Sequence, residues 1–231
     1  MNGARIVAAG DAALVAEFEE RIDPAVNARV VALADALRAL ELPGVRDVVP
    51  TFRSVTVYFD PLVADVAGLA DAMRELARTG AAAHARESRT VDVPVCYDAV
   101  YGLDLDDVAR GAGMTAAEVI ELHTAATCRV FMLGFVPGFA YLGPIDPRIA
   151  TPRLAAPRTR VPAGSVGIAG AQTGIYPLAT PGGWNLVGRT PLRMLDLTRD
   201  TPARLRPGDR VRFRAIDRAE FERLTDAAWT S

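Results

Sequence analysis

The sequence contains no lysine, since all 26 of its basic residues are arginine. A chain without lysine has no GxxxxGK phosphate loop, no Schiff-base lysine and no residue on which biotin could be carried. Its histidines are only His84 and His123, which excludes a histidine-rich metal site. A formal net charge of −2 leaves no basic excess for binding nucleic acid. We therefore expect this chain to hold neither a metal nor biotin.

Cysteines and long apolar runs are also scarce. Cys96 and Cys128 are isolated in the sequence, without a CxxC pair, so we expect both to be reduced and at least partly buried. No apolar run approaches the roughly 18 residues of a transmembrane helix. Acidic residues follow the N-terminus too soon for a signal peptide. These absences predict a cytoplasmic protein without a membrane partner.

The first part of the chain, residues 1–97, has the pattern of a small α+β domain. Asp23 and Pro24 form the start signal of a helix, and apolar residues recur after them at helical spacing. A second helix follows from about Val66. The expected strands are Ile6–Ala8, Leu14–Phe18, Val45–Val49, Val55–Phe59 and Val91–Val95. This order predicts helices on one face of an antiparallel sheet, with ferredoxin-like packing.

Residues 98–127 are predicted to form a helical connector, and residues 128–231 a mainly-β domain. In the connector, Thr115 and Glu118 have the spacing of a capping box that opens a helix to about Ala126. The β domain is rich in turn-forming residues, since ten of the nineteen glycines and nine of the sixteen prolines lie between Gly134 and Pro191. Such density excludes long helices and predicts short strands. The clearest candidates are Ser165–Ala169, Gly174–Leu178, Asn185–Val187 and Arg210–Phe213, followed by a short helix at Glu220–Ala228.

Four phrases of this region stand in a fixed order: GFVPGFAYLG from Gly134, DPRIATPRL from Asp146, RVPAGSVGIAGAQTGIYP from Arg160 and PGGWNLVGRTP from Pro181. In these phrases the chain resembles the family known as the B subunit of the prokaryotic ATP-dependent 5-oxoprolinase and as allophanate hydrolase subunit 1. A sporulation-kinase inhibitor is also a member, and the domain (carboxyltransferase subdomains C and D) recurs in urea carboxylase. The resemblance implies a cyclophilin-like β-barrel for residues 128–231. Pro144 departs from the family pattern, in which a second glycine is expected after Tyr-Leu-Gly.

The resemblance also implies an activity. It predicts the B subunit of a complex that opens 5-oxo-L-proline to L-glutamate, with ATP as co-substrate. The implied partners are the other two subunits of the 5-oxoprolinase complex, of types A and C, the latter resembling allophanate hydrolase subunit 2. The chain itself offers no evident nucleophile–base pair, so we expect it to be inactive alone. Two alternatives remain open: a component of a biotin-dependent carboxyltransferase, and a non-enzymatic inhibitor of a histidine kinase.

The candidate catalytic residues are His123 and Arg189. His123 lies just before the predicted barrel, where it could reach a cleft. Arg189, in the GRTP phrase, could hold a carboxylate or phosphoryl group in a bidentate manner. Ser165 is not expected to be a nucleophile, because no neighbouring base is evident and the G-x-S-x-G pattern is absent. A structural role is the alternative for His123.

A second set of residues is predicted to bind the substrate or a partner. Gln172 could offer both a donor and an acceptor to a lactam amide from a turn between two glycines. Aromatic rings in the GFVPGFAYLG phrase could form an apolar floor, and Trp184 could anchor a partner protein. Turn formation and core packing are the alternatives. The candidates for substrate binding are Arg153, Gln172, Thr173, Phe135 and Tyr141.

Overall fold

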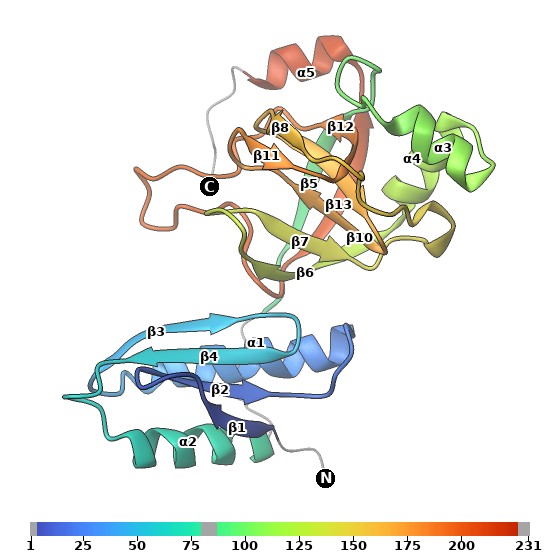
Figure 1. The fold of residues 1–231 in the computed structure, drawn as a ribbon. Helices are drawn as coiled ribbons and strands as arrows, with labels where there is room; N and C mark the ends of the chain where they lie inside the picture. Colours follow the sequence, from blue (N-terminus) through green and yellow to red (C-terminus); the bar gives the residue numbers. More distant parts are fainter. Residues whose placement is uncertain (1–3, 80–86, 226–231) are drawn as a thin grey trace. The chain divides into compact units, whose positions relative to one another are not determined.

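The computed structural model describes residues 4–79 and 87–225. The chain divides into two compact units, Met1–Ser88 and Arg89–Ser231, which we call the N-terminal unit and the barrel unit. Figure 1 shows the elements of each. Within the described residues, no helix is long and apolar enough to cross a membrane.

The N-terminal unit is an antiparallel sheet with two helices on one face. The helices α1 (Pro24–Ala39) and α2 (Val66–Thr79) share one apolar core with the strands. Helix α1 begins as predicted, because the Asp23 carboxylate accepts hydrogen bonds from the backbone N–H groups of Ala25 and Val26. The strands, in sheet order, are β1 (Arg5–Ala8), β2 (Ala13–Glu17), β4 (Ser54–Phe59) and β3 (Val45–Pro50).

The strand predicted to close this sheet belongs elsewhere. Strand β5 (Thr90–Cys96), which contains Val91, Val93 and Val95, pairs in parallel with β13 (Arg210–Ile216) in the barrel unit. Its prediction as the last strand of the N-terminal sheet was wrong. A ferredoxin-like unit needs a strand after its second helix in the same sheet. That packing is therefore not confirmed, and β1 occupies the edge beside β2.

The barrel unit contains the predicted barrel, and it is closed. Seven described strands run in the order β10-β7-β6-β13-β5-β12-β9, and β9 pairs with β10 to complete the ring. The other barrel strands are β6 (Thr127–Leu133), β7 (Ala140–Gly143), β9 (Ser165–Ala169), β10 (Gln172–Ile175) and β12 (Asn185–Arg189). A separate two-stranded sheet consists of β8 (Arg158–Val161) and β11 (Thr180–Gly182).

Short helices accompany the barrel strands. They are α3 (Leu105–Ala112), α4 (Ala116–Ala125), the 3-10 helix η2 (Pro147–Ile149) and α5 (Arg218–Thr225). The predicted capping box is present at the start of α4, with both reciprocal bonds between Thr115 and Glu118. The predicted terminal helix begins at Arg218, and residues 226–228 of that prediction lie outside the described residues. Cys96 and Cys128 are both buried and unpaired, as expected.

Candidate functional site

A cluster of aromatic rings covers the outer side of β7, β9 and β10. Leu142 and Ile168 point into the barrel core, so the alternating residues Tyr141 and Gly167 face outward. We use the name aromatic face for Phe135, Phe139, Tyr141, Tyr176 and Trp184. Phe139 is its centre, with edge-on contacts to Tyr141, Tyr176 and Trp184 at centroid distances of 4.9, 5.0 and 5.5 Å. Such edge-to-face pairs add to the stabilisation from buried area.

Two facing glycines make room for this cluster. Gly167 and Gly174 are paired across β9 and β10. A Cβ atom at Gly174 would lie 2.9 Å from the Phe139 ring and 3.0 Å from the Trp184 ring. The density of glycine in this region therefore reflects close packing of rings against the sheet, in addition to the turns that we expected.

Trp184 is buried in this cluster rather than displayed on the surface. Only 5% of the residue is exposed. The role predicted for it, an anchor that inserts into a partner, needs an accessible ring, and the structure leaves little of the ring for a partner to cover. The guanidinium of Arg153 lies 5.9 Å from the Trp184 ring centroid, within the range of a cation–π contact. Trp184 thus supports a cation at the margin of the aromatic face.

Gln172 lies on the same outer side of the sheet as Tyr141. Gly174 pairs directly with Tyr141, and Gln172 is two residues from Gly174 on the same strand. The Nε2 atom of Gln172 is buried and has no hydrogen-bond partner among the described residues. A buried donor without a partner is unfavourable unless a ligand or water satisfies it. Gln172, Tyr141 and Arg153, three of the residues predicted for substrate binding, thus lie on or beside one face.

Phe135 extends this face from the loop between β6 and β7. It is 61% exposed and contacts the edge of Phe139 at 5.7 Å. Its φ is +66°, a left-handed conformation that is uncommon for a residue with a bulky side chain. Backbone conformations of this kind persist where the surroundings hold them and occur often at binding sites. Phe135 is the exposed apolar member of the predicted floor.

His123 and Thr173, by contrast, lie inside the barrel. Both are fully buried. Thr173 Oγ1 donates its proton to Gly167 O at 3.0 Å, so it accepts from His123 Nε2 at 2.9 Å. His123 Nδ1 must then accept from the Tyr97 hydroxyl, at 2.7 Å. This chain of bonds defines a neutral tautomer, and the ring also stacks on Phe213.

The catalytic role predicted for His123 does not fit this position. Both ring nitrogens are occupied, and no exposed atom is available to a substrate. Burial lowers the pKa of His123 from 6.5 to about 4, because the low-polarity interior disfavours the charged form. Likewise, Thr173 cannot contact a ligand on the outer side of the sheet. Both residues hold α4 against the strands.

Protonation of His123 gives a testable pH dependence. The unfolded chain titrates this group near pH 6.5 and the folded chain near 4, so the unfolded state binds more protons between these values. The free energy of unfolding should therefore be highest above pH 6.5 and fall as the pH drops toward 4, by up to about 3 kcal/mol from this residue. Urea unfolding of the wild type and of His123→Gln, each at pH 7.5 and 4.5, measures this contribution. The wild type should lose more stability than the variant between the two pH values. A difference between the two proteins that does not change with pH would contradict the assignment.

Arg189 lies apart from the aromatic face, in a cleft of the barrel unit with a volume of about 990 Å³. Residues 163–164, 177–178 and 189–191, which belong to the family phrases, contribute to its wall. We call it the arginine cleft, after Arg189, Arg193, Arg199 and Arg204. Arg189 Nε donates to Ala163 O at 2.8 Å, and its guanidinium lies 5.9 Å from the Tyr101 ring centroid. Neither Gln172 nor Arg153 lines this cleft, so the structure does not join the predicted residues into one site.

The family model of the carboxyltransferase domain, subdomains C and D, matches residues 4–205. The chain belongs to this family. The 5-oxoprolinase B subunit of Bacillus subtilis (strain 168) is 39% identical over 226 residues, which cover 92% of each chain. The 5-oxoprolinase B subunit of Escherichia coli O157:H7 is 44% identical over 216 residues, which cover 92% of this chain and 96% of that protein.

A solved structure extends the similarity to three dimensions. The crystal structure of TTHA0988 matches the chain with a TM-score of 0.78 and 39% identity. The match covers 89% of this chain but 40% of that one, so this carboxyltransferase-family chain spans less than half of the solved relative. The family resemblance inferred from the four phrases is confirmed.

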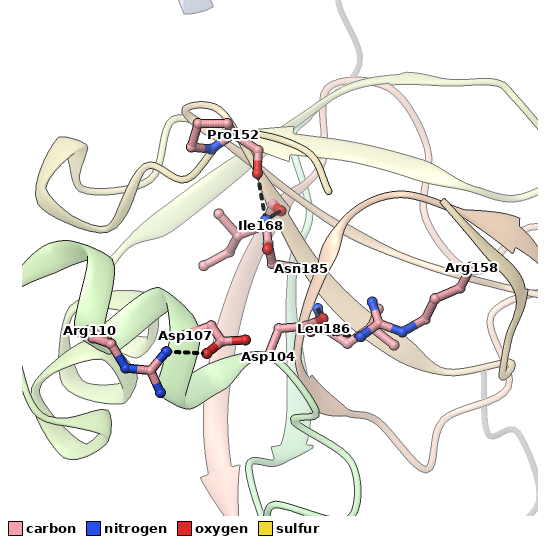
Figure 2. Close-up of polar contacts among 8 residues, drawn as sticks. All are labelled: Asp104, Asp107, Arg110, Pro152, Arg158, Ile168, Asn185 and Leu186. Atoms are coloured by element: carbon pink, nitrogen blue, oxygen red, sulfur yellow. Dashed lines mark hydrogen bonds and ion pairs between the residues drawn. The ribbon is translucent and has the colours of Figure 1, made fainter. Parts of the chain in front are cut away.

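In this carboxyltransferase-family chain, sequence reasoning missed the groups that hold the aromatic face in place. Asn185 Nδ2 donates to Pro152 O at 2.7 Å and to Ile168 O at 3.2 Å (Figure 2). Pro152 precedes Arg153 and Asn185 follows Trp184, so this bond ties the segments that carry the cation and the ring. A backbone bond from Leu154 N to Gly183 O at 2.8 Å joins them again. In the sequence, the sign of this contact was that Asn185, a residue able to donate hydrogen bonds, directly follows Trp184 in the PGGWN phrase.

A second missed residue is Asp104, at the start of α3. Its buried carboxylate accepts from Leu186 N at 2.7 Å and from Arg158 Nη2 at 2.6 Å. Figure 2 shows Asp104 and Arg158 beside Leu186, with the ion pair of Asp107 and Arg110 on the same helix. Asp104 thus fixes α3 and β8 to β12. A buried, paired carboxylate of this kind has a structural role.

No metal centre is found in the part of the chain that the structure describes. It contains no group of three His, Cys, Asp or Glu side chains that could hold a metal ion. His84 lies outside the described residues. The side chains of the aromatic face and the arginine cleft can form hydrogen bonds, attract anions through arginine and make apolar contacts.

Proposed function

We propose that this chain is the B subunit of an ATP-dependent 5-oxoprolinase, a complex that opens 5-oxo-L-proline to L-glutamate with hydrolysis of ATP. The similarity to two proteins named as 5-oxoprolinase B subunits carries the proposal, because it spans 92% of this chain and at least 92% of each relative. The partners would be the other two subunits of the complex, of types A and C, and the complex would act in the cytoplasm.

The aromatic face is the proposed site for 5-oxoproline. This substrate is a small lactam with a carboxylate, so it needs a cation, an amide-type partner and an apolar surface. Arg153 would bind the carboxylate, while the unpartnered Nε2 of Gln172 would donate to the lactam C=O. Phe135 and Tyr141 would cover the ring methylenes. These residues bind and orient the substrate, and none of them is a nucleophile.

The reaction also needs a nucleophile and a base, and neither Ser165 nor His123 is placed to supply one. Opening a lactam requires loss of its amide resonance, which phosphoryl transfer to the carbonyl oxygen would promote. Of the potential nucleophiles and bases, Ser165 is 2% exposed and His123 is buried with both nitrogens bonded. We therefore assign the nucleophile and base to the partner subunits.

The isolated chain should accordingly show no 5-oxoproline-dependent release of ADP. Activity should appear only when both partner subunits are added, because the binding groups and the reacting groups lie on different chains. A coupled assay for ADP, with and without 5-oxoproline, measures this. Stimulated ADP release by the chain alone would contradict the division of roles. A fully assembled complex that fails to hydrolyse 5-oxoproline would contradict the proposed function itself.

A further inference from the structure

The arginine cleft has the charge expected of a site for a highly anionic ligand. Among the described residues, four arginines and one acidic residue, Asp196, line it, which gives these side chains a formal charge of +3. Asp196 lies 3.8 Å from Arg193, at the limit of an ion pair, and it also accepts bonds from Thr198. An anion that enters the cleft would therefore meet an excess of positive charge.

The arginines of the cleft are crowded. Arg204 Nε donates to the backbone oxygen of Arg193 at 2.9 Å, which brings the two residues side by side. Burial lowers the pKa of Arg204, and the nearby charge of Arg199 lowers it further. Like charges held close together repel each other, and a bound anion relieves that repulsion. The crowding is thus a feature that a ligand would stabilise.

Arg189 is held so that its end remains available to the cleft. Its Nε is bonded to Ala163 O, and it has no acidic partner among the described residues. The turn beside it is fixed, because Thr190 N donates to Gly164 O and a Cβ at Gly164 would lie 2.5 Å from Thr190 O. Gly164 also has a φ of +82°, which favours glycine. The guanidinium is therefore presented from a rigid turn, as bidentate phosphate binding requires.

The size and walls of the cleft suit more than a single anion. Its volume of about 990 Å³ is at the upper end of small-molecule pockets. Apolar side chains form part of the lining: Leu178, Leu192, Leu195, Phe221 and Leu224. Leu178 is 42% exposed, so an apolar group of a ligand could cover it. A ligand with both a polyanionic end and a flat apolar end matches this combination.

We infer that the arginine cleft binds a nucleoside triphosphate, with Arg189 and Arg193 on its phosphates and the apolar lining against its base. The inference deepens the proposed function and rests on it, because it assigns a binding site on this chain to the ATP that the complex would use. It also stands apart from the aromatic face, since none of the residues assigned to 5-oxoproline lines the cleft.

Calorimetric titration of the full chain tests the inference without turnover. The probes are ATP, tripolyphosphate, inorganic phosphate and adenosine. We expect ATP to bind more tightly than tripolyphosphate, tripolyphosphate more tightly than phosphate, and affinity to fall as salt is raised. Arg189→Gln should weaken ATP binding at least tenfold. Arg193→Gln, at an exposed side chain with one long ion pair, should weaken it several-fold without disturbing the fold.

The control is Arg110→Gln, which removes an arginine from the surface of α3 in the same unit. It should leave ATP affinity unchanged, and thermal midpoints identify any variant that is misfolded. The proposed site would be overturned if Arg110→Gln weakened ATP binding as much as the cleft variants do. It would also be overturned if neither Arg189→Gln nor Arg193→Gln changed the affinity for ATP. Absence of ATP binding by both the chain and the assembled complex would also overturn it. A complex that hydrolyses 5-oxoproline normally with both cleft arginines replaced would place ATP elsewhere while leaving the proposed function intact.

Discussion

Replacement of His123 by alanine is expected to lower the free energy of unfolding by about 3 kcal/mol or more. The change removes a buried ring that stacks on Phe213 and leaves a cavity. It also deprives the buried Tyr97 hydroxyl of its acceptor, while Thr173 keeps its bond to Gly167. Urea unfolding at pH 7.5, followed by circular dichroism, measures the effect.

Glu121→Ala is the matched control for this experiment. Glu121 lies on the same helix, α4, but is exposed, so its loss should change stability by less than about 0.5 kcal/mol. If His123→Ala unfolds at the same urea concentration as the control, the bond chain does not stabilise the barrel. If it is as stable as the wild type but abolishes turnover of the complex, a catalytic role would replace the structural one.

Replacement of Arg153 by alanine in the assembled complex is expected to lower kcat/KM for 5-oxoproline about 30-fold, or about 2 kcal/mol. The reason is that the substrate carboxylate loses its cation. Gln172→Ala should lower kcat/KM about fivefold, or about 1 kcal/mol, as for a neutral hydrogen bond. Initial rates over a range of 5-oxoproline concentrations at saturating ATP measure both.

Arg160→Ala provides the comparison, because it removes an exposed arginine from the neighbouring strand β8. It should retain wild-type kinetics. A merely structural role for Arg153 and Gln172 predicts lower thermal midpoints with unchanged kcat/KM. That pattern, in well-assembled complexes, would remove 5-oxoproline from the aromatic face.

Local signals in the sequence were sufficient for most elements of the fold. Asp23 with Pro24, and Thr115 with Glu118, start helices where predicted, because capping depends on residues a few positions apart. The sheet to which strand β5 belongs could not be predicted from local signals. Alternating valines predict a strand with one buried side, but they do not specify which sheet provides the neighbours. Its partner β13 lies about 120 residues further on, and no local pattern links the two.

The site was predictable in part, for a related reason. The register of β7 and β10 brings Tyr141 and Gln172 to one side of the sheet. His123 was misjudged because its partners, Tyr97 and Thr173, are 26 and 50 residues away. Trp184 was misjudged because a flexible Gly-Gly neighbour suggested exposure, whereas Gly167 and Gly174 provide a recess for its ring. Burial depends on such distant pairings.

The bond chain inside the barrel also bears on ligand capture at its outer side. Thr173 is fixed through its hydroxyl to His123 and to Gly167, and Gln172 is its neighbour on β10. The backbone of Gln172 is therefore ordered before any ligand arrives. Binding of the proposed substrate would then restrict only the side-chain torsions of Gln172, so the conformational entropy lost on association would be smaller than for the same amide on a mobile loop. Loosening the barrel interior should weaken binding through a more negative entropy change, even though no contact with the ligand is altered.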